Sequence, residues 1–460
     1  MAIVKLKLRR TSQEGFLVIL TGTNRAFETE GVLPPLPPEL ELSFNQWQSS
    51  YRQLDAVRSC IAPAPGVRLT PKGVTIHSNS EHIASVKAYL NQWLNSGDSQ
   101  WQPIRDGLIL LANQLNQASD EIRVILDAKD IDLRRLPWQE WSLFEEHYPQ
   151  AEIALSAPRG YENHSIKLLP NSSKVRILVV VGRSDGINTK DDLEVIQKLE
   201  TLGAETICLM QPSLKELCEA LWDDIGYHIF IFTGHSGSRE DGQIGWIEVN
   251  DKESLSIEQF KDALREAIGK GLQLAIFNSC DGLGLANQLS ELHLPQSIVM
   301  REPVPDPVAL EFLRYFFQEF TQNKSVFASV QAARKRLEHF KSDYPGAVWL
   351  PTLCITPSVE PLTWQNLQGS FSQQTPKTNP RTRIRIGLIG SDLLGAVLSL
   401  GIFLLQQNPQ ALPTPWIEQS SQNEKGTKTP TAPYKNFVDV PDVPQGIWFY
   451  GGSTAWAKIQ

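Results

Sequence analysis

Two residues that could act together in catalysis, Cys280 and His235, each follow an apolar run of strand length. The run 274–278 leads through one Ser to Cys280, and the run 229–233 leads through one Gly to His235. In cysteine-dependent catalysis the thiolate is the nucleophile, and an adjacent imidazole generates it and later protonates the leaving group. The two motifs therefore predict a Cys–His pair, provided that both strands end at the same edge of one sheet.

Each residue also has a simpler interpretation when it is taken alone. A lone Cys after a strand is usually a small buried hydrophobe, and a lone His in a Gly-flanked turn is usually a turn residue. Their joint placement favours chemistry, because catalytic groups gather at the carboxyl ends of strands in open α/β sheets. The small residues in both turns leave backbone amides that are free to stabilise an oxyanion.

Strands and helices alternate along the chain from Glu121, which predicts an α/β fold with a mainly parallel sheet and helices on both faces. Strands are expected at 122–126, 152–156, 175–181, 206–210, 228–233, 272–277 and 296–300. Helices are expected at 189–202, 213–222, 256–268, 282–292, 306–321 and 325–341. A short extra strand is expected beside the His235 loop, at 243–249.

The N-terminal residues predict elements that carry no chemistry of their own. A hairpin is expected at 4–10 and 16–20, and helical patterns follow at about 42–57, 79–96 and 101–117. We therefore divide this part of the chain into a hairpin and helix at 1–65, a helical part at 66–119 and the α/β core at 120–357.

Composition excludes several classes of function. The 460 residues suggest two or three domains, and the net charge of -8 argues against nucleic acid as a main partner. The 5 cysteines are scattered and form no CxxC pair, so they predict neither a disulfide framework nor a zinc site. We expect no metal and no cofactor, and a reducing compartment for the folded body. We expect no signal peptide, because the first ten residues are charged and contain no apolar core segment.

The stretch from Ile386 to Leu405 differs in kind from the rest of the chain. It has a single charged residue, Asp392, and at helical rise it spans roughly 30 Å, the thickness of one bilayer core. The gain from its apolar residues exceeds the insertion cost of Asp392, so we expect a transmembrane helix between linkers at 358–385 and 406–436. Arginines precede the span and no Lys or Arg follows until Lys425. This asymmetry predicts a single-pass protein of the inner (plasma) membrane with a cytoplasmic N-terminal body.

Residues from about 120 to 357 resemble the CHAT domain of cyanobacterial proteins, a caspase-like domain with the clan CD cysteine peptidase fold. The resemblance is carried by the blocks RLPW at 135–138, FTGHSGS at 232–238, LAIFNSCDGLGLA at 274–286, IVMREPVPD at 298–306 and WLPTLC at 349–354. It implies a caspase-hemoglobinase sheet with His235 and Cys280 at the dyad positions. Peptidases of this clan usually have Gly directly after the His, whereas here Ser236 comes before Gly237.

The C-terminal sequence 443–459 looks like the opening of a phosphate-type substrate-binding domain of ABC transporters. Its Gly-Gly-Ser-Thr at 451–454 resembles the first anion-contacting loop of such domains. The match covers only the fragment 437–460, which we expect to be the truncated start of such a domain and not to bind ligand.

Together these features predict a membrane-anchored cysteine endopeptidase that acts on a protein or peptide substrate. Cys280 would attack the scissile carbonyl, and His235 would keep the thiol partly ionised and protonate the departing amine. Backbone amides of Cys280 and of Ser236 or Gly237 would hold the oxyanion.

Four charged residues near these loops are candidates for the substrate pocket. Asp281 either lines a pocket for a basic substrate side chain or caps the helix that follows it. Arg301, Glu302 and Asp306 follow the next strand end, where they either shape the pocket or simply belong to a polar surface loop.

Two other functions fit the same sequence. One is a catalytically silent signalling scaffold that keeps the fold and binds a signalling partner through the N-terminal helices. The other is a transmembrane sensor, in which an outer solute-binding domain controls the inner domain. The separation between the side chains of His235 and Cys280 discriminates between hydrolase and scaffold, since proton transfer needs hydrogen-bond reach or a bridging water.

Overall fold

The computed structural model divides the chain into two units, residues 1–377 and residues 378–460. The described residues are 2–12, 15–22, 27–54, 57, 76–115, 121–156, 174–239, 242–280, 282–356 and 361–369, together with the backbone of 447–451 and 455–459.

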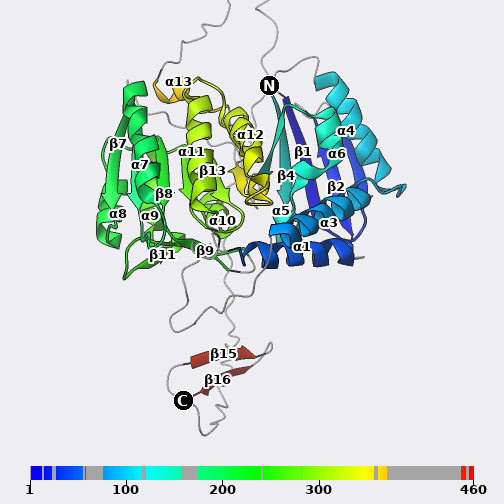
Figure 1. Cartoon of the computed structure of the whole chain (residues 1–460), viewed down its shortest axis with the longest axis horizontal. Coiled ribbons are helices and arrows are strands. Elements are labelled where there is room, and N and C mark those ends of the chain that lie inside the picture. Colours follow the sequence, from blue (N-terminus) through cyan, green and yellow to red (C-terminus); the bar gives the residue numbers. More distant parts are fainter. Residues whose placement is uncertain are drawn as a thin grey trace, which may run out of the picture. The chain divides into compact units, whose positions relative to one another are not determined.

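An 11-stranded sheet forms the centre of the first unit (Figure 1). Its strands in spatial order are β3 (Glu28–Leu33), β2 (Phe16–Thr21), β1 (Ala2–Arg10), β4 (Ile122–Ala128), β5 (Ala151–Ser156), β14 (Pro351–Ile355), β13 (Gln296–Met300), β12 (Leu274–Asn278), β8 (Ile229–Thr233), β6 (Val175–Val181) and β7 (Ala204–Met210). The pairs β1–β2, β2–β3 and β13–β14 are antiparallel, and the other pairs are parallel. The predicted mainly parallel sheet is therefore confirmed.

The burial of the strands explains why their sequences differ. All residues of β6, β8, β12 and β13 are buried, as expected for continuous apolar runs that are covered on both faces of a parallel sheet. β1 instead alternates between buried and half-buried residues, which is typical of a strand with only one face in the core.

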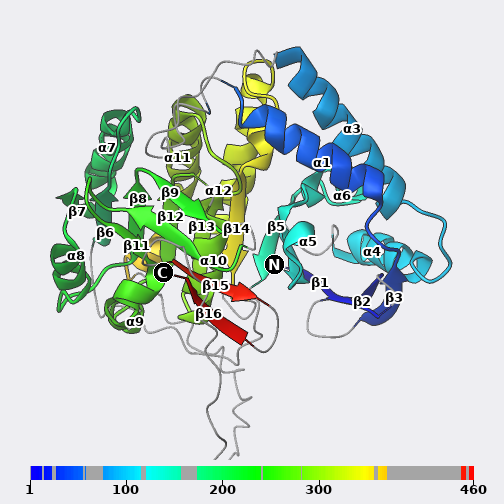
Figure 2. The same ribbon diagram turned by 90° about the horizontal axis from the view of Figure 1, so that it is seen from below.

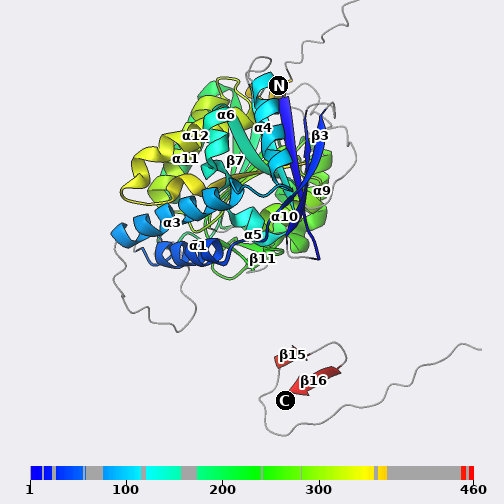
Figure 3. The ribbon, with the colours of Figure 1, turned by 90° about the vertical axis from the view of Figure 1, so that its right-hand side faces the viewer.

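Helices cover both faces of the sheet, as the alternation of elements predicts. Figure 2 shows α7 (Thr189–Gln197), α11 (Asp306–Phe320) and α12 (Val326–Arg336) on one face, and α8 (Leu214–Leu221), α9 (Lys261–Gly269) and α10 (Leu283–Glu291) on the other. In the N-terminal part, α1 (Pro38–Tyr51) packs on α3 (Ile76–Leu94), and α4 (Gln102–Leu115) packs on β2 and β3 (Figure 3). The described residues of this unit also form three shorter α-helices, α5 (Ile131–Arg135), α6 (Ser142–His147) and α13 (Trp364–Leu367).

A three-stranded sheet lies beside the His235 loop. It consists of β9 (Ser236–Ser238), β10 (Gly245–Glu248) and β11 (Ser254–Ser256), paired antiparallel. The short extra strand predicted at 243–249 is β10, so this prediction is confirmed.

Two features of the large sheet were not predicted. The N-terminal hairpin belongs to the same sheet as the core, because β1 pairs in parallel with β4 from Ala2 to Leu8. β14 is inserted antiparallel between β13 and β5, and it begins at a Pro, a residue that strands accept at their first position. Both pairings join distant parts of the sequence, so no local pattern indicates them.

The predicted fold class is wrong on one point, the transmembrane helix from Ile386 to Leu405. None of the helices in the described ranges is long and apolar enough to cross a membrane. The stretch from Ile386 to Leu405 itself lies outside the described residues. The prediction summed apolar side chains as if the stretch were already a helix, and such a sum does not establish that the helix forms.

In the second unit the structure describes one antiparallel pair, β15 (Ile447–Gly451) and β16 (Ala455–Ile459). β15 ends at Gly451, the first residue of the Gly-Gly-Ser-Thr sequence at 451–454. Residues 452–454 lie outside the described residues.

Candidate active site

The loops that carry Cys280 and His235 meet at one edge of the sheet. β8 and β12 are neighbouring parallel strands, and their last residues, Thr233 and Asn278, are register partners. His235 and Cys280 each lie two residues beyond these partners, on strands that run about 4.8 Å apart. The prediction that both loops share an edge of the sheet is confirmed. Both side chains are buried, with 3% and 6% of their surface exposed.

A backbone carbonyl orients the imidazole of His235. Its Nε2 lies 3.0 Å from the carbonyl oxygen of Asp185, in the loop between β6 and α7. A carbonyl only accepts hydrogen bonds, so this contact places the ring proton on Nε2 and leaves Nδ1 as the basic nitrogen of the neutral ring. The backbone of His235 is fixed as well, because its amide donates to the Arg183 carbonyl and its carbonyl accepts from the Glu248 amide, both at 2.9 Å. His235 can therefore act as an oriented base through Nδ1.

The hydroxyl of Ser236 ties the His loop to the Cys loop. Its Oγ is hydrogen-bonded to the Ser279 Oγ, at 2.8 Å, and to the carbonyl oxygen of Cys280. A hydroxyl has one proton, so Ser236 donates to the carbonyl and accepts from the Ser279 hydroxyl. Ser236 thus has a structural role, which is to fix the two loops against each other.

The pairing of β9 with β10 decides which amide of the His loop could serve an oxyanion. The Glu248 amide donates to the His235 carbonyl, so these two residues form a hydrogen-bonded pair at the start of the ladder. Hydrogen-bonded and non-hydrogen-bonded pairs alternate in an antiparallel ladder, which puts Ser236 at a non-hydrogen-bonded position and Gly237 at a hydrogen-bonded one. The ladder therefore turns the Ser236 amide, rather than the Gly237 amide, away from β10.

A buried carboxylate, Asp192 of α7, bridges the ends of the two strands. Its Oδ2 accepts a hydrogen bond from Thr233 Oγ1 at 2.7 Å and another from Asn278 Nδ2 at 3.0 Å. Burial raises the pKa of Asp192 to about 6; the two hydrogen bonds oppose this rise, and the nearby Asp306 adds to it. Because its two donors are register partners, Asp192 fixes the spacing between the candidate catalytic loops.

Cys280 lines a small pocket of about 10 Å³, which is room for roughly one water molecule. Asp192, Asp306 and Asn278 also line it. Asn278 Oδ1 is buried without a hydrogen-bond partner, and Asp306 Oδ2 accepts from the Asn188 backbone amide at 2.8 Å. Two carboxylates and an unpaired amide oxygen suit a ligand group that is cationic and donates hydrogen bonds.

The predicted pocket residues have different positions in the structure. Asp306 lines the pocket beside Cys280, whereas Asp281 lies outside the described residues. Arg301 and Glu302 belong to the loop that leads from β13 to Asp306, but each is buried against other partners. The guanidinium of Arg301 donates to two carbonyl oxygens of the RLPW block at 2.8 and 2.6 Å. The carboxylate of Glu302 accepts from Arg52 Nε at 2.8 Å.

The other described cysteines do not have the character of nucleophiles. Cys208 is exposed, Cys218 is half-buried and Cys354 is buried, and burial raises the pKa of each of these thiols. A raised pKa disfavours the thiolate, which is the reactive form. Within the described ranges, no group of three or more His, Cys, Asp or Glu side chains is placed to hold a metal ion.

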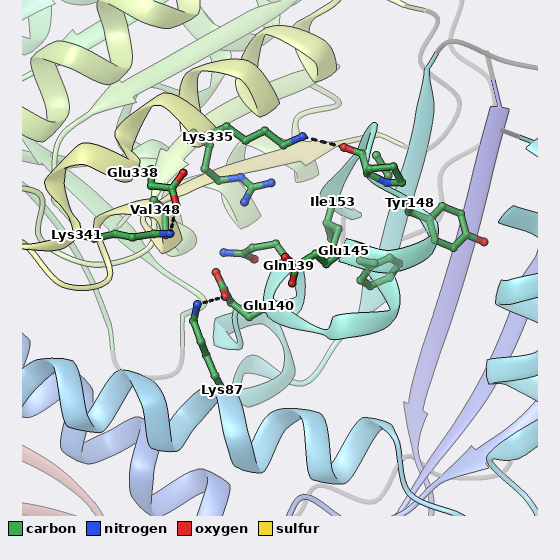
Figure 4. A pocket seen from close by; sticks show the side chains of 14 residues that line it. Lys87, Gln139, Glu140, Glu145, Tyr148, Ile153, Lys335, Glu338, Lys341 and Val348 are labelled. Carbon is green, nitrogen blue, oxygen red and sulfur yellow. Dashed lines mark hydrogen bonds and ion pairs between the residues drawn. The ribbon is translucent and has the colours of Figure 1, made fainter.

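A larger cavity, of about 410 Å³, lies elsewhere in the first unit (Figure 4). It lies between the β5–α6 region and the end of α12, and charged side chains surround it. Lys87 pairs with Glu140 at 2.5 Å, and Lys335 donates to the Pro149 carbonyl at 2.8 Å. Size alone would favour this cavity as a binding site. Because neither candidate catalytic residue lines it, we place the candidate chemistry at the smaller pocket instead.

Sequence reasoning missed two groups at this site, the Asp185 carbonyl and Asp192. A backbone carbonyl has no residue-type signal, so only the fold reveals its contact with His235. Asp192 had a weak signal, since it stands in the first turn of a helix that follows a strand end. Negative charge is favoured at that position in any helix, which gave a sufficient explanation without a role at the site.

Comparisons with known proteins place these features in a family. The crystal structure of the Drosophila initiator caspase Dronc is similar to part of the chain, with 9% identity, a TM-score of 0.27, and coverage of 40% of this chain and 83% of that chain. None of the curated proteins matches the chain. Residues 101–374 match the family model of the CHAT domain, and this range includes both candidate catalytic loops. Because the match extends over more than half of the sequence, the chain belongs to the CHAT domain family.

Proposed function

We propose that the chain is a cysteine endopeptidase of the CHAT domain family, with Cys280 and His235 as its catalytic dyad. The observation that carries the proposal is the position of these residues, each just beyond a register partner on neighbouring parallel strands. The contact between His235 Nε2 and the Asp185 carbonyl supports it, because a base oriented by a third group is a recurring part of activated nucleophiles.

In this mechanism His235 Nδ1 takes the proton of the Cys280 thiol, and the thiolate attacks the carbonyl carbon of the scissile peptide bond. The amides of Cys280 and Ser236 stabilise the oxyanion of the tetrahedral intermediate. His235 then gives its proton to the departing amine, and a thioester with Cys280 remains. A water molecule, deprotonated by His235, hydrolyses the thioester and regenerates the thiol.

The pocket next to Cys280 favours a substrate with a basic side chain at the residue before the scissile bond. Asp192 and Asp306 supply negative charge, and the unpaired Asn278 Oδ1 supplies a further acceptor. An ammonium or guanidinium group would satisfy all three. Its binding would also lower the pKa of Asp192, because a nearby positive charge favours the ionised carboxylate.

A peptide-library cleavage assay on the full chain tests the activity. We expect cleavage after Lys or Arg by the wild type and none by Cys280→Ala, since the variant lacks the nucleophile. Cys208→Ala is the matched control, because it removes an exposed thiol outside the site and should leave cleavage unchanged. Cleavage that survives in Cys280→Ala would contradict the proposal.

The second candidate function is a catalytically silent scaffold, and the size of the pocket favours it. At about 10 Å³ the pocket beside Cys280 holds no substrate side chain in this conformation. A scaffold predicts that the wild type cleaves no library peptide and that Cys280→Ala retains every partner bound by the wild type. Pull-down of partners with both proteins, run beside the cleavage assay, separates the two functions.

A further inference from the structure

The segment 301–306 connects the candidate active site with the N-terminal part of the chain. It consists of the loop between β13 and α11 and the first residue of α11, and we call it the 301–306 loop. Near its end, Val304 and Asp306 line the pocket beside Cys280. Near its start, Glu302 is buried, with 1% of its surface exposed. The loop therefore forms one wall of the pocket and carries a buried charge at its other end.

Side chains at the end of α1 hold this buried charge. Gln48 Nε2 donates to Glu302 Oε1, and Arg52 Nε donates to Glu302 Oε2 at 2.8 Å. The Tyr51 hydroxyl donates to the carbonyl oxygen of the next loop residue, Pro303, at 2.9 Å. Three side chains from the last turn of α1 and its C-cap residue thus join α1 to two adjacent residues of the loop.

The helix that makes these contacts is itself firmly placed. The ring of Trp47 packs against Trp349, with centroids 4.9 Å apart. α1 lies outside the range 101–374 that matches the CHAT domain family, so a buried carboxylate inside that range depends on an element from outside it. A buried carboxylate that loses its cationic partner is strongly unfavourable unless the group moves into water.

We infer that α1 is a latch that holds the 301–306 loop over the pocket, and that releasing Glu302 from Arg52 and Gln48 opens the site at Cys280. The inference rests on the proposed catalytic function of Cys280, whereas its test measures how accessible the Cys280 thiol is. In the latched state the loop is held at both ends, by α1 at Glu302 and by the Asn188 amide at Asp306. The pocket between these two points is then too small for a substrate side chain.

The double variant Gln48→Ala/Arg52→Ala tests the latch. It leaves Glu302 without these two partners, so the loop should move to hydrate the carboxylate and expose Cys280. We expect the rate of Cys280 alkylation by iodoacetamide, followed by mass spectrometry of the full chain, to rise by about tenfold or more. Adding Glu302→Gln removes the uncompensated charge and should return the rate close to that of the wild type.

Two controls separate opening of the loop from general loosening of the fold. Cys354 is buried in the same sheet, and its labelling should stay slow in the double variant. Lys87→Ala breaks another ion pair between an N-terminal helix and the core, Lys87–Glu140, and should leave Cys280 labelling unchanged. An unchanged Cys280 rate in the double variant, or an equal rise at Cys354, would overturn the inference.

The labelling experiment also distinguishes failure of the latch from failure of the proposed peptidase. If the latch holds but the chain is no peptidase, alkylation rises in the double variant and no peptide is cleaved by any variant. If the peptidase holds but the latch is wrong, the wild type cleaves peptides and the double variant is neither labelled nor active at a higher rate.

Discussion

Two buried carboxylates belong to the elements around the pocket, and their charges are compensated in different ways. Asp192 accepts its hydrogen bonds from a hydroxyl and an amide, both neutral, and burial raises its pKa to about 6. Glu302 accepts from a guanidinium, with Arg52 Nη2 at 2.6 Å from its Oε2. The two neutral donors bind Asp192 Oδ2 without offsetting the cost of burying the charge of the carboxylate. A carboxylate kept at such a cost next to a thiol is a candidate for binding a cation, whereas Glu302 has the character of a structural group.

The largest change in stability is expected at Asp192, because its buried charge is poorly compensated. Asp192→Asn keeps the shape of the side chain and removes the buried charge. At pH 7 the variant should be more stable than the wild type by up to about 3 kcal/mol, from the difference between the folded-state pKa of about 6 and the model value of 3.8. Urea unfolding at a series of pH values measures this difference.

Proton linkage determines how the stability difference between the wild type and Asp192→Asn changes with pH. Because the pKa of Asp192 is higher in the folded state, this group's contribution to stability is fully present below pH 3.8 and is lost as the pH rises through about 6. The wild type and Asp192→Asn should therefore be equally stable near pH 3.8, and the advantage of the variant should grow toward pH 7. A difference that is independent of pH would show that the pKa of Asp192 is not raised in the folded state.

A smaller change in stability, of opposite sign, is expected when the carboxylate of Glu302 is replaced by an amide. Glu302→Gln removes the charge that Arg52 binds, and should lower stability at pH 7 by about 1–2 kcal/mol. The Arg52 side chain is 40% exposed, so water partly replaces the lost partner and limits the loss. Urea unfolding of both variants side by side sharpens the comparison. Changes of the same sign in the two variants would refute the distinction drawn between the two carboxylates.

The smallest effect is expected for the hydroxyl that joins the two loops. Ser236→Ala removes the hydrogen bonds to Ser279 and to the Cys280 carbonyl, and should cost about 1 kcal/mol of stability. If the hydroxyl also positions Cys280, kcat for peptide cleavage should fall while KM stays near the wild-type value. Ser236→Gly should behave like Ser236→Ala; full activity in both variants would leave the hydroxyl no part in positioning the thiol.

Local sequence patterns were sufficient to predict the elements that carry the candidate dyad. The apolar runs before His235 and Cys280 are buried on both faces, so nothing in their sequence competes with strand formation, and both strands lie within a residue or two of their predicted ends. Small residues after each run place a turn at the edge of the sheet. The strand at β6 and the strand at β13 have the predicted bounds for the same reason.

The contacts that shape the site could not be predicted in this way, because they join residues far apart in the sequence. Glu302 was read as a pocket residue or a surface group, yet its partners Gln48 and Arg52 lie about 250 residues away and belong to a helix with no chemistry of its own. The wall of the pocket at Asp192 depends on hydrogen bonds to two strand ends rather than on its own neighbours. The prediction of a transmembrane helix was wrong because apolar content alone does not determine which conformation a stretch adopts.

The parallel pairing of β1 with β4 has a practical consequence for the expression of truncated forms of the protein. β1 contacts β4 along its whole length, from Ile122 to Ala128, and every residue of β4 is buried. Expression of residues 101–374 alone would remove β1 and leave β4 as an exposed edge strand. The unpaired backbone groups of such an edge form hydrogen bonds with strands of other chains. Such a truncated product should form aggregates, so soluble material for biochemistry must begin at the first strand.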